Sequence, residues 1–63
     1  MESINKVAGR EVEVTIRGER GFTFSFDNID KDATRKICEF FNGQAKIEVQ
    51  EDEECGTFIY CDV

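Results

Sequence analysis

The feature that most constrains the fold is the change in the spacing of apolar residues along the chain. In residues 10–18 apolar and polar side chains alternate, and the alternation returns in residues 22–26. A period of two is typical of β-strands that bury one face. Glycines begin and end the intervening segment 18–21, which suits a tight turn. We therefore expect the two segments to pair as an antiparallel hairpin.

The spacing becomes helical after this hairpin, in residues 30–41. One apolar stripe recurs every three or four residues and is made by Ala33, Ile37 and Phe40 or Phe41. Asp30 is placed to cap the first turn, and Gly43 is placed to end the helix, because glycine adopts the left-handed conformation at low cost. The pattern predicts a helix of about three turns that needs a sheet to pack against.

Alternation resumes in residues 45–50 and continues in residues 57–63. The order strand, strand, helix, strand, strand predicts an α+β fold, a single small domain over residues 1–63 with one helix packed on a four-stranded antiparallel sheet. Residues 1–9 fit either a short edge strand or an ordered tail, and the pattern does not decide between them.

The apolar positions of these segments define the expected core. Its predicted members are Val12, Val14, Ile16, Phe22, Phe24, Phe26, Ile37, Phe41, Ile47 and Val49. A chain of 63 residues buries only about 60% of the surface that it exposes when unfolded, so its stability is marginal. Hydrophobic residues nevertheless make up 40% of the chain, which is a globular rather than a disordered composition.

Charge and cysteine content bear on partners and location. The chain carries 14 acidic and 8 basic residues, a formal net charge of −6, which disfavours binding to nucleic acid or to an anionic membrane. We expect a protein partner with a basic surface instead. No segment has the length of a membrane span and the N-terminal residues lack a signal-peptide apolar core, so we expect a cytoplasmic protein. The three cysteines should stay reduced there; a Cys55–Cys61 bridge would require an oxidising compartment.

Four consecutive carboxylates, Glu51, Asp52, Glu53 and Glu54, occupy the expected loop between the last two strands. One interpretation is a solvated loop whose charge discourages aggregation. The other is a recognition surface for a basic partner, which the outward-facing Glu11, Glu13 and Glu48 would extend over the sheet. Gly56 follows the run and can supply a bulge or a positive φ.

The last expected strand is apolar on both faces. If Ile59 and Cys61 face the helix, then Phe58 and Tyr60 face away from it; the reverse orientation exposes the first pair. Either arrangement leaves apolar side chains on a face that one helix cannot cover. That face is then an interface for a partner or a second copy, or else it is covered by curling of the sheet or by the N-terminal segment.

The chain lacks the residue patterns of common catalytic and metal sites. It has no histidine, no Cys-x-x-Cys pair, no calcium loop and no glycine-rich phosphate loop. We therefore expect no enzymatic activity, no cofactor and no metal.

Size, charge and this lack of catalytic patterns lead to two hypotheses. The first is a non-catalytic protein-binding inhibitor or regulator that occludes a basic surface, such as that of a nucleic-acid-binding enzyme. Small acidic proteins of phages and mobile elements, including anti-CRISPR proteins and nucleic-acid mimics, act in this way. This first hypothesis is based on analogy with such proteins in size and charge. The alternative is a homodimeric structural, assembly or adaptor module. Steep loss of binding with salt would favour the first.

Overall fold

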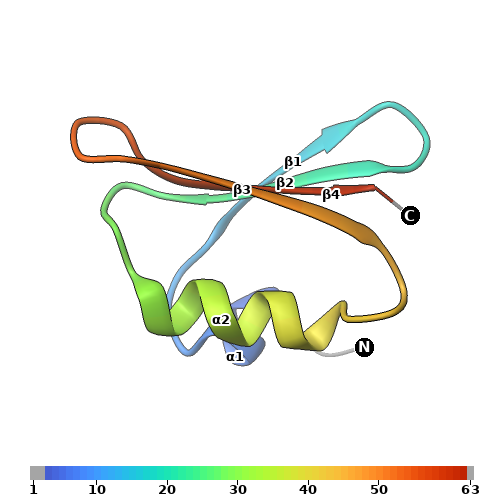
Figure 1. Ribbon diagram of the computed structural model, residues 1–63, viewed down its shortest axis with the longest axis horizontal. Helices are drawn as coiled ribbons and strands as arrows, with labels where there is room; N and C mark the ends of the chain where they lie inside the picture. Colours follow the sequence, from blue (N-terminus) through green and yellow to red (C-terminus); the bar gives the residue numbers. More distant parts are fainter. Residues whose placement is uncertain (1–2, 63) are drawn as a thin grey trace.

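The computed structural model describes residues 3–62 and shows a small α+β domain with a four-stranded antiparallel sheet (Figure 1). The elements in chain order are α1 (Ile4–Ala8), β1 (Glu13–Arg17), β2 (Gly21–Phe26), α2 (Lys31–Phe40), β3 (Lys46–Asp52) and β4 (Gly56–Asp62). The predicted β-β-α-β-β order is confirmed. Both helices lie on one side of the sheet, so the other side is an open face within the described chain.

The strand order in the sheet is β1-β2-β4-β3, and each neighbouring pair is antiparallel. The last strand, β4, is therefore central, with β2 on one side and β3 on the other. β1 and β3 form the two edges. The register aligns Val14 with Phe24, Phe24 with Ile59, and Ile59 with Val49. These four side chains share the face that the helices cover in part.

Helix α2 begins as its sequence predicts, but it ends at Phe40 with Phe41 as its C-cap, before the predicted stop at Gly43. The Asp30 carboxylate accepts a hydrogen bond from the Ala33 backbone N–H at 3.0 Å and so caps the first turn. Ala33 and Ile37 are buried against the sheet. Beyond the helix, Gly43 has a φ of +79°, the left-handed conformation that glycine adopts readily.

The N-terminal segment forms a short helix, so the alternative of a short edge strand was wrong. Ser3 caps the N-terminus of α1, and Gly9 ends it with a φ of +74°. Ala8 is buried, and α1 packs beside α2 (Figure 1). The Asn5 side chain accepts a hydrogen bond from the Val12 backbone N–H at 2.9 Å, which ties α1 to the residues that lead into β1. Met1 and Glu2 lie outside the described residues.

The core is smaller than predicted and lies nearer the centre of the sheet. Of the predicted members, Val12, Phe24, Phe26 and Ile37 are buried, and Phe22, Phe41 and Ile47 are half-buried against them. Val14, Ile16 and Val49 are 46%, 71% and 36% exposed, so their assignment to the core was wrong. They are on the helix side but in the edge strands; the β1–β2 hairpin extends away from the helices in Figure 1.

Strand β4 supplies three core residues that the prediction lacked. Ile59, Cys61 and Thr57 are fully buried. The buried Thr57 hydroxyl donates a hydrogen bond to the Asn28 carbonyl oxygen at 2.9 Å, which satisfies its polar atom. This bond also fixes the start of β4 to the loop before α2.

Candidate functional site

The orientation of β4 is set by its register with β2. Phe24 pairs with Ile59 and both are buried, so the odd-numbered residues of β4 face the helices. Phe58 and Tyr60 consequently lie on the open face, where both are half-buried. The described N-terminal residues do not cover this face, because α1 packs on the opposite side.

The open face consists of three cross-strand rows of side chains. The first row is Glu13, Ser25, Phe58 and Gln50. The second row is Thr15, Thr23, Tyr60 and Glu48. The third row is Arg17, Gly21, Asp62 and Lys46. The two aromatic side chains thus occupy the middle of the face, with carboxylates and other polar groups around them.

Arg17 organises the centre of the open face. Its Nε donates a hydrogen bond to the Thr23 hydroxyl at 2.7 Å, and Thr23 is only 8% exposed as a result. The guanidinium lies over the Tyr60 ring, 5.1 Å from its centroid, in a cation–π contact. Its Nη2 is 3.4 Å from the Asp62 carboxylate. These contacts hold Tyr60 in place and leave one side of the ring at the surface. The sequence pattern did not single out Arg17, because its role depends on strand pairing.

The prediction that the four consecutive carboxylates occupy one loop was wrong. β3 continues through Asp52, and the turn consists of residues 53–55. Glu51 lies on the helix side of β3, where its carboxylate is 2.7 Å from the Lys31 ammonium. The Asp52 carboxylate accepts backbone hydrogen bonds from Glu54 at 2.8 Å and Cys55 at 3.2 Å. Two of the four carboxylates therefore have structural partners.

The remaining predicted site residues are exposed acids at one end of the sheet and on the open face. Glu53 and Glu54 lie in the β3–β4 turn, Glu13 and Glu48 lie on the open face, and Glu11 lies just before β1. None of these five carboxylates makes an ion pair with a side chain in residues 3–62. They are the part of the predicted acidic surface that is available to a partner.

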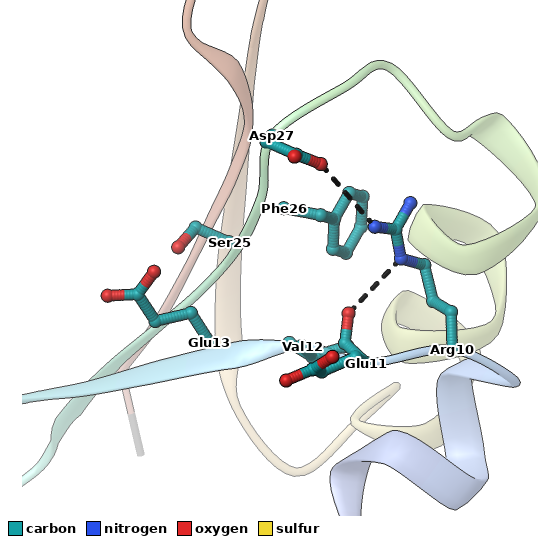
Figure 2. Close-up of a pocket in the computed structure, with 7 residues that line it drawn as sticks. All are labelled: Arg10, Glu11, Val12, Glu13, Ser25, Phe26 and Asp27. Atoms are coloured by element: carbon teal, nitrogen blue, oxygen red, sulfur yellow. Dashed lines mark hydrogen bonds and ion pairs between the residues drawn. The ribbon is translucent and has the colours of Figure 1, made fainter.

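A shallow hollow of about 470 Å³ lies beside this acidic end (Figure 2). The Arg10 guanidinium stacks 4.7 Å from the Phe26 ring centroid and lies 3.3 Å from Asp30 and 3.7 Å from Asp27. Its Nη1 also donates a hydrogen bond to Asn28 at 2.6 Å. Arg10 thus joins the segment before β1 to the segment after β2. Its charge is compensated by the Asp27 and Asp30 carboxylates.

The cysteines occupy different environments. Cys55 is exposed in the β3–β4 turn, whereas Cys61 is buried on the helix side and Cys38 is half-buried on α2. Burial raises the pKa of the Cys38 and Cys61 thiols. All three are free thiols, so the structure has no Cys55–Cys61 bridge. Within residues 3–62, no three histidine, cysteine or acidic side chains are placed together to hold a metal ion.

Comparison of the chain with protein-family models, curated proteins and solved structures finds no match. The described part of the chain has no helix long and apolar enough to cross a membrane.

Proposed function

We propose that this chain is a non-catalytic protein-binding inhibitor or regulator whose open sheet face binds a partner with a basic surface. The observation that carries the proposal is the placement of Phe58 and Tyr60 on an uncovered face, with Glu48 directly beside Tyr60 and Glu13 in the row of Phe58. Half-buried aromatic side chains ringed by polar groups are the usual composition of an interface centre.

The contacts of Arg17 support this proposal on energetic grounds. A side chain that is already ordered loses little conformational entropy when a partner covers it. Arg17 holds the Tyr60 ring from one side and is itself held by Thr23 and Asp62. Tyr60 is thus ordered before binding.

The charge distribution supports a basic partner. Five acids, Glu11, Glu13, Glu48, Glu53 and Glu54, have no ion-pair partner in the described chain. Among the bases in residues 3–62, Arg10, Arg17, Lys31, Arg35 and Lys36 are paired, and Lys6, Arg20 and Lys46 are not. Unpaired carboxylates raise the association rate with a basic surface and orient it. A nucleic-acid-binding enzyme in the cytoplasm offers such a surface. An acidic inhibitor of the phage or mobile-element type, like an anti-CRISPR protein, is the form of the proposal that size and charge favour.

The test compares capture of proteins from an extract of the source cells by the wild-type chain and by matched variants. Phe58→Ala and Tyr60→Ala should lose the captured protein, because each removes an aromatic group from the centre of the face. Glu39→Gln, on the exposed side of α2, should retain it. Circular dichroism of each variant confirms that the fold is kept.

The dependence of the association rate on salt concentration tests the electrostatic part of the proposal. Neutralising Glu13 and Glu48 with glutamine should slow association with the captured protein and reduce its dependence on ionic strength. Capture that survives both aromatic substitutions in folded protein would contradict the assignment of the open face. Association kinetics unchanged by the glutamine variant would contradict a basic partner surface.

A further inference from the structure

The outer edge of β1 is an unpaired strand edge in the described chain. β1 is the first strand of the order β1-β2-β4-β3, and all five of its residues are exposed. Its pairing with β2 is regular from Glu13 to Arg17, with no bulge that would twist the edge away, and it contains neither proline nor lysine. A bulge, a proline or a lysine is among the features that protect an edge strand, whose backbone N–H and C=O groups can pair with another strand.

The side chains of β1 differ between its two faces. On the helix side, Val14 and Ile16 are 46% and 71% exposed because the helices do not extend beneath them. On the open face, Glu13 and Arg17 carry opposite charges at the two ends of the strand, with Thr15 at its centre. Reversing the strand end to end about Thr15 therefore exchanges the acid with the base.

We propose that β1 pairs antiparallel with β1 of a second copy of this chain, about a two-fold axis at Thr15, and so forms a continuous eight-stranded sheet. In this register Glu13 of each copy lies opposite Arg17 of the other, and Thr15 lies opposite its own counterpart. Val14 lies opposite Ile16 on the helix side. Opposite-charge and β-branched pairs in these positions stabilise an antiparallel pair.

The rows already present in the monomer extend across this junction. On the helix side, Phe24 and Val14 of one copy continue into Ile16 and Phe22 of the other, because Val14 pairs with Phe24 and Ile16 with Phe22 within each chain. The exposed Ile16 thereby gains an apolar neighbour. On the open face, Glu13 makes no ion pair in residues 3–62, and Arg17 Nη1 donates no hydrogen bond there. Glu13 is therefore free to pair across the junction, whereas pairing of Arg17 there competes with its contacts to Thr23, Tyr60 and Asp62.

The other edge strand, β3, does not offer the same complementarity. It carries three carboxylates, Glu48, Glu51 and Asp52, against the single base Lys46. Self-pairing of β3 about Val49 would place Lys46 opposite Asp52, but it would also place Glu51 opposite the apolar Ile47. Glu51 is also paired with Lys31 in its own chain. The charge pattern therefore assigns the dimer junction to β1.

This inference goes beyond the proposed function, since the junction uses the edge of β1 and leaves Phe58 and Tyr60 uncovered. The central position, Thr15, permits a direct test. Thr15→Lys and Thr15→Glu each place like charges opposite one another across the two-fold axis. We expect each variant alone to raise the dimer dissociation constant about tenfold or more. An equimolar mixture of the two should form a heterodimer, because lysine then faces glutamate.

Analytical ultracentrifugation over a concentration series up to the millimolar range provides the measurement. Wild type should sediment increasingly as a dimer, and the control Gln50→Lys on the opposite edge should behave like wild type. Glu13→Arg should weaken the dimer independently, because it places two arginines opposite each other at both ends of the junction. Backbone NMR spectra confirm folding of each variant. A monomeric wild type throughout the series, a dimer that is insensitive to Thr15 charge, or a mixture that stays monomeric would each overturn the proposal.

Discussion

The Lys31 ammonium and the Glu51 carboxylate lie 2.7 Å apart and join the first turn of α2 to the edge strand β3. Glu51 lies two residues after Val49 and four after Ile47 in β3, so it faces the helix side as they do. One member of an apparently continuous acidic run is therefore part of the packing between helix and sheet. Its neighbours Glu53 and Glu54 make no such contact within the described chain.

This difference predicts opposite effects of neutralisation on stability. Glu51→Gln should lower the free energy of unfolding by about 0.2–1 kcal/mol, because it removes an ion pair at the surface. Glu53→Gln with Glu54→Gln should leave stability level or raise it slightly, because crowded like charges are removed. Urea unfolding followed by circular dichroism measures both. Equal destabilisation by the two changes would contradict the separate roles.

Gly56 and Gly43 form a matched pair for testing backbone constraints. Both have positive φ, +97° and +79°. A β carbon on Gly56 would clash with the Phe26 carbonyl oxygen and the Asp27 backbone, whereas one on Gly43 would meet no atom within 4 Å. Gly43→Ala should cost about 1–2 kcal/mol from the left-handed conformation alone. Gly56→Ala should cost at least about twice that, because the strands must also separate.

Thermal unfolding of the two alanine variants measures this difference. Both variants carry the cost of an alanine at positive φ. The additional loss of melting temperature in Gly56→Ala therefore reports the close approach of the start of β4 to the end of β2. Similar melting temperatures for the two variants would show that this approach is not rigid.

The periodic segments were predictable because period and turn residues act locally. Alternation located all four strands, and the Asp30 cap and the stripe through Ala33 and Ile37 located α2. Helix α1 was missed because five residues are too few to display a period. The pair of Ser3 before it and Gly9 after it was the available signal, since these residues cap its two ends.

Most of the errors in the core and the site come from tertiary arrangement. Alternation predicts that Val14 and Ile16 share a face with Phe24, but it does not predict how far the helices extend along that face. The orientation of Phe58 and Tyr60 was undecidable because β4 is apolar on both sides, and pairing with β2 decides it. Alternation could have placed Glu51 on the helix side; the prediction erred by ending β3 too early.

Phe24 should be the most sensitive aromatic position in the core. It is 5% exposed, and its ring stacks on Phe41 with centroids 5.5 Å apart and on Phe22 at 6.4 Å. Phe24→Ala should lower the free energy of unfolding by about 3–5 kcal/mol, a large share of the stability of so small a domain. Phe40→Ala is the control, because Phe40 is 43% exposed. Chemical denaturation that shows a smaller loss for Phe24→Ala than for Phe40→Ala would contradict the assigned core.

The three thiols should differ in their rate of alkylation. The thiolate is the reactive form, and burial raises the pKa of Cys38 and Cys61, so both should react slowly at neutral pH in the folded protein. Cys55 is exposed in the turn and should react first. Iodoacetamide labelling followed by peptide mass spectrometry resolves the sites. In denaturant all three should label at similar rates, and preferential labelling of Cys61 in the native protein would contradict its burial.

Acid should destabilise the domain through the first turn of α2. The Ala33 backbone N–H lowers the pKa of Asp30, with a further contribution from Arg10, and Lys36 and Arg35 lower the pKa of Asp32. A carboxyl group whose pKa is lower in the folded state stabilises the fold above its unfolded value, here 3.8, and loses that contribution as the pH falls through the folded value. Stability should therefore decline below pH 3.8.

Asp30→Asn with Asp32→Asn keeps a capping side chain but removes both titrations, so the stability of this double variant should decline less steeply over the same range. Urea unfolding at a series of pH values measures the two slopes, and parallel profiles for wild type and variant would show that these carboxylates do not link α2 to acid stability.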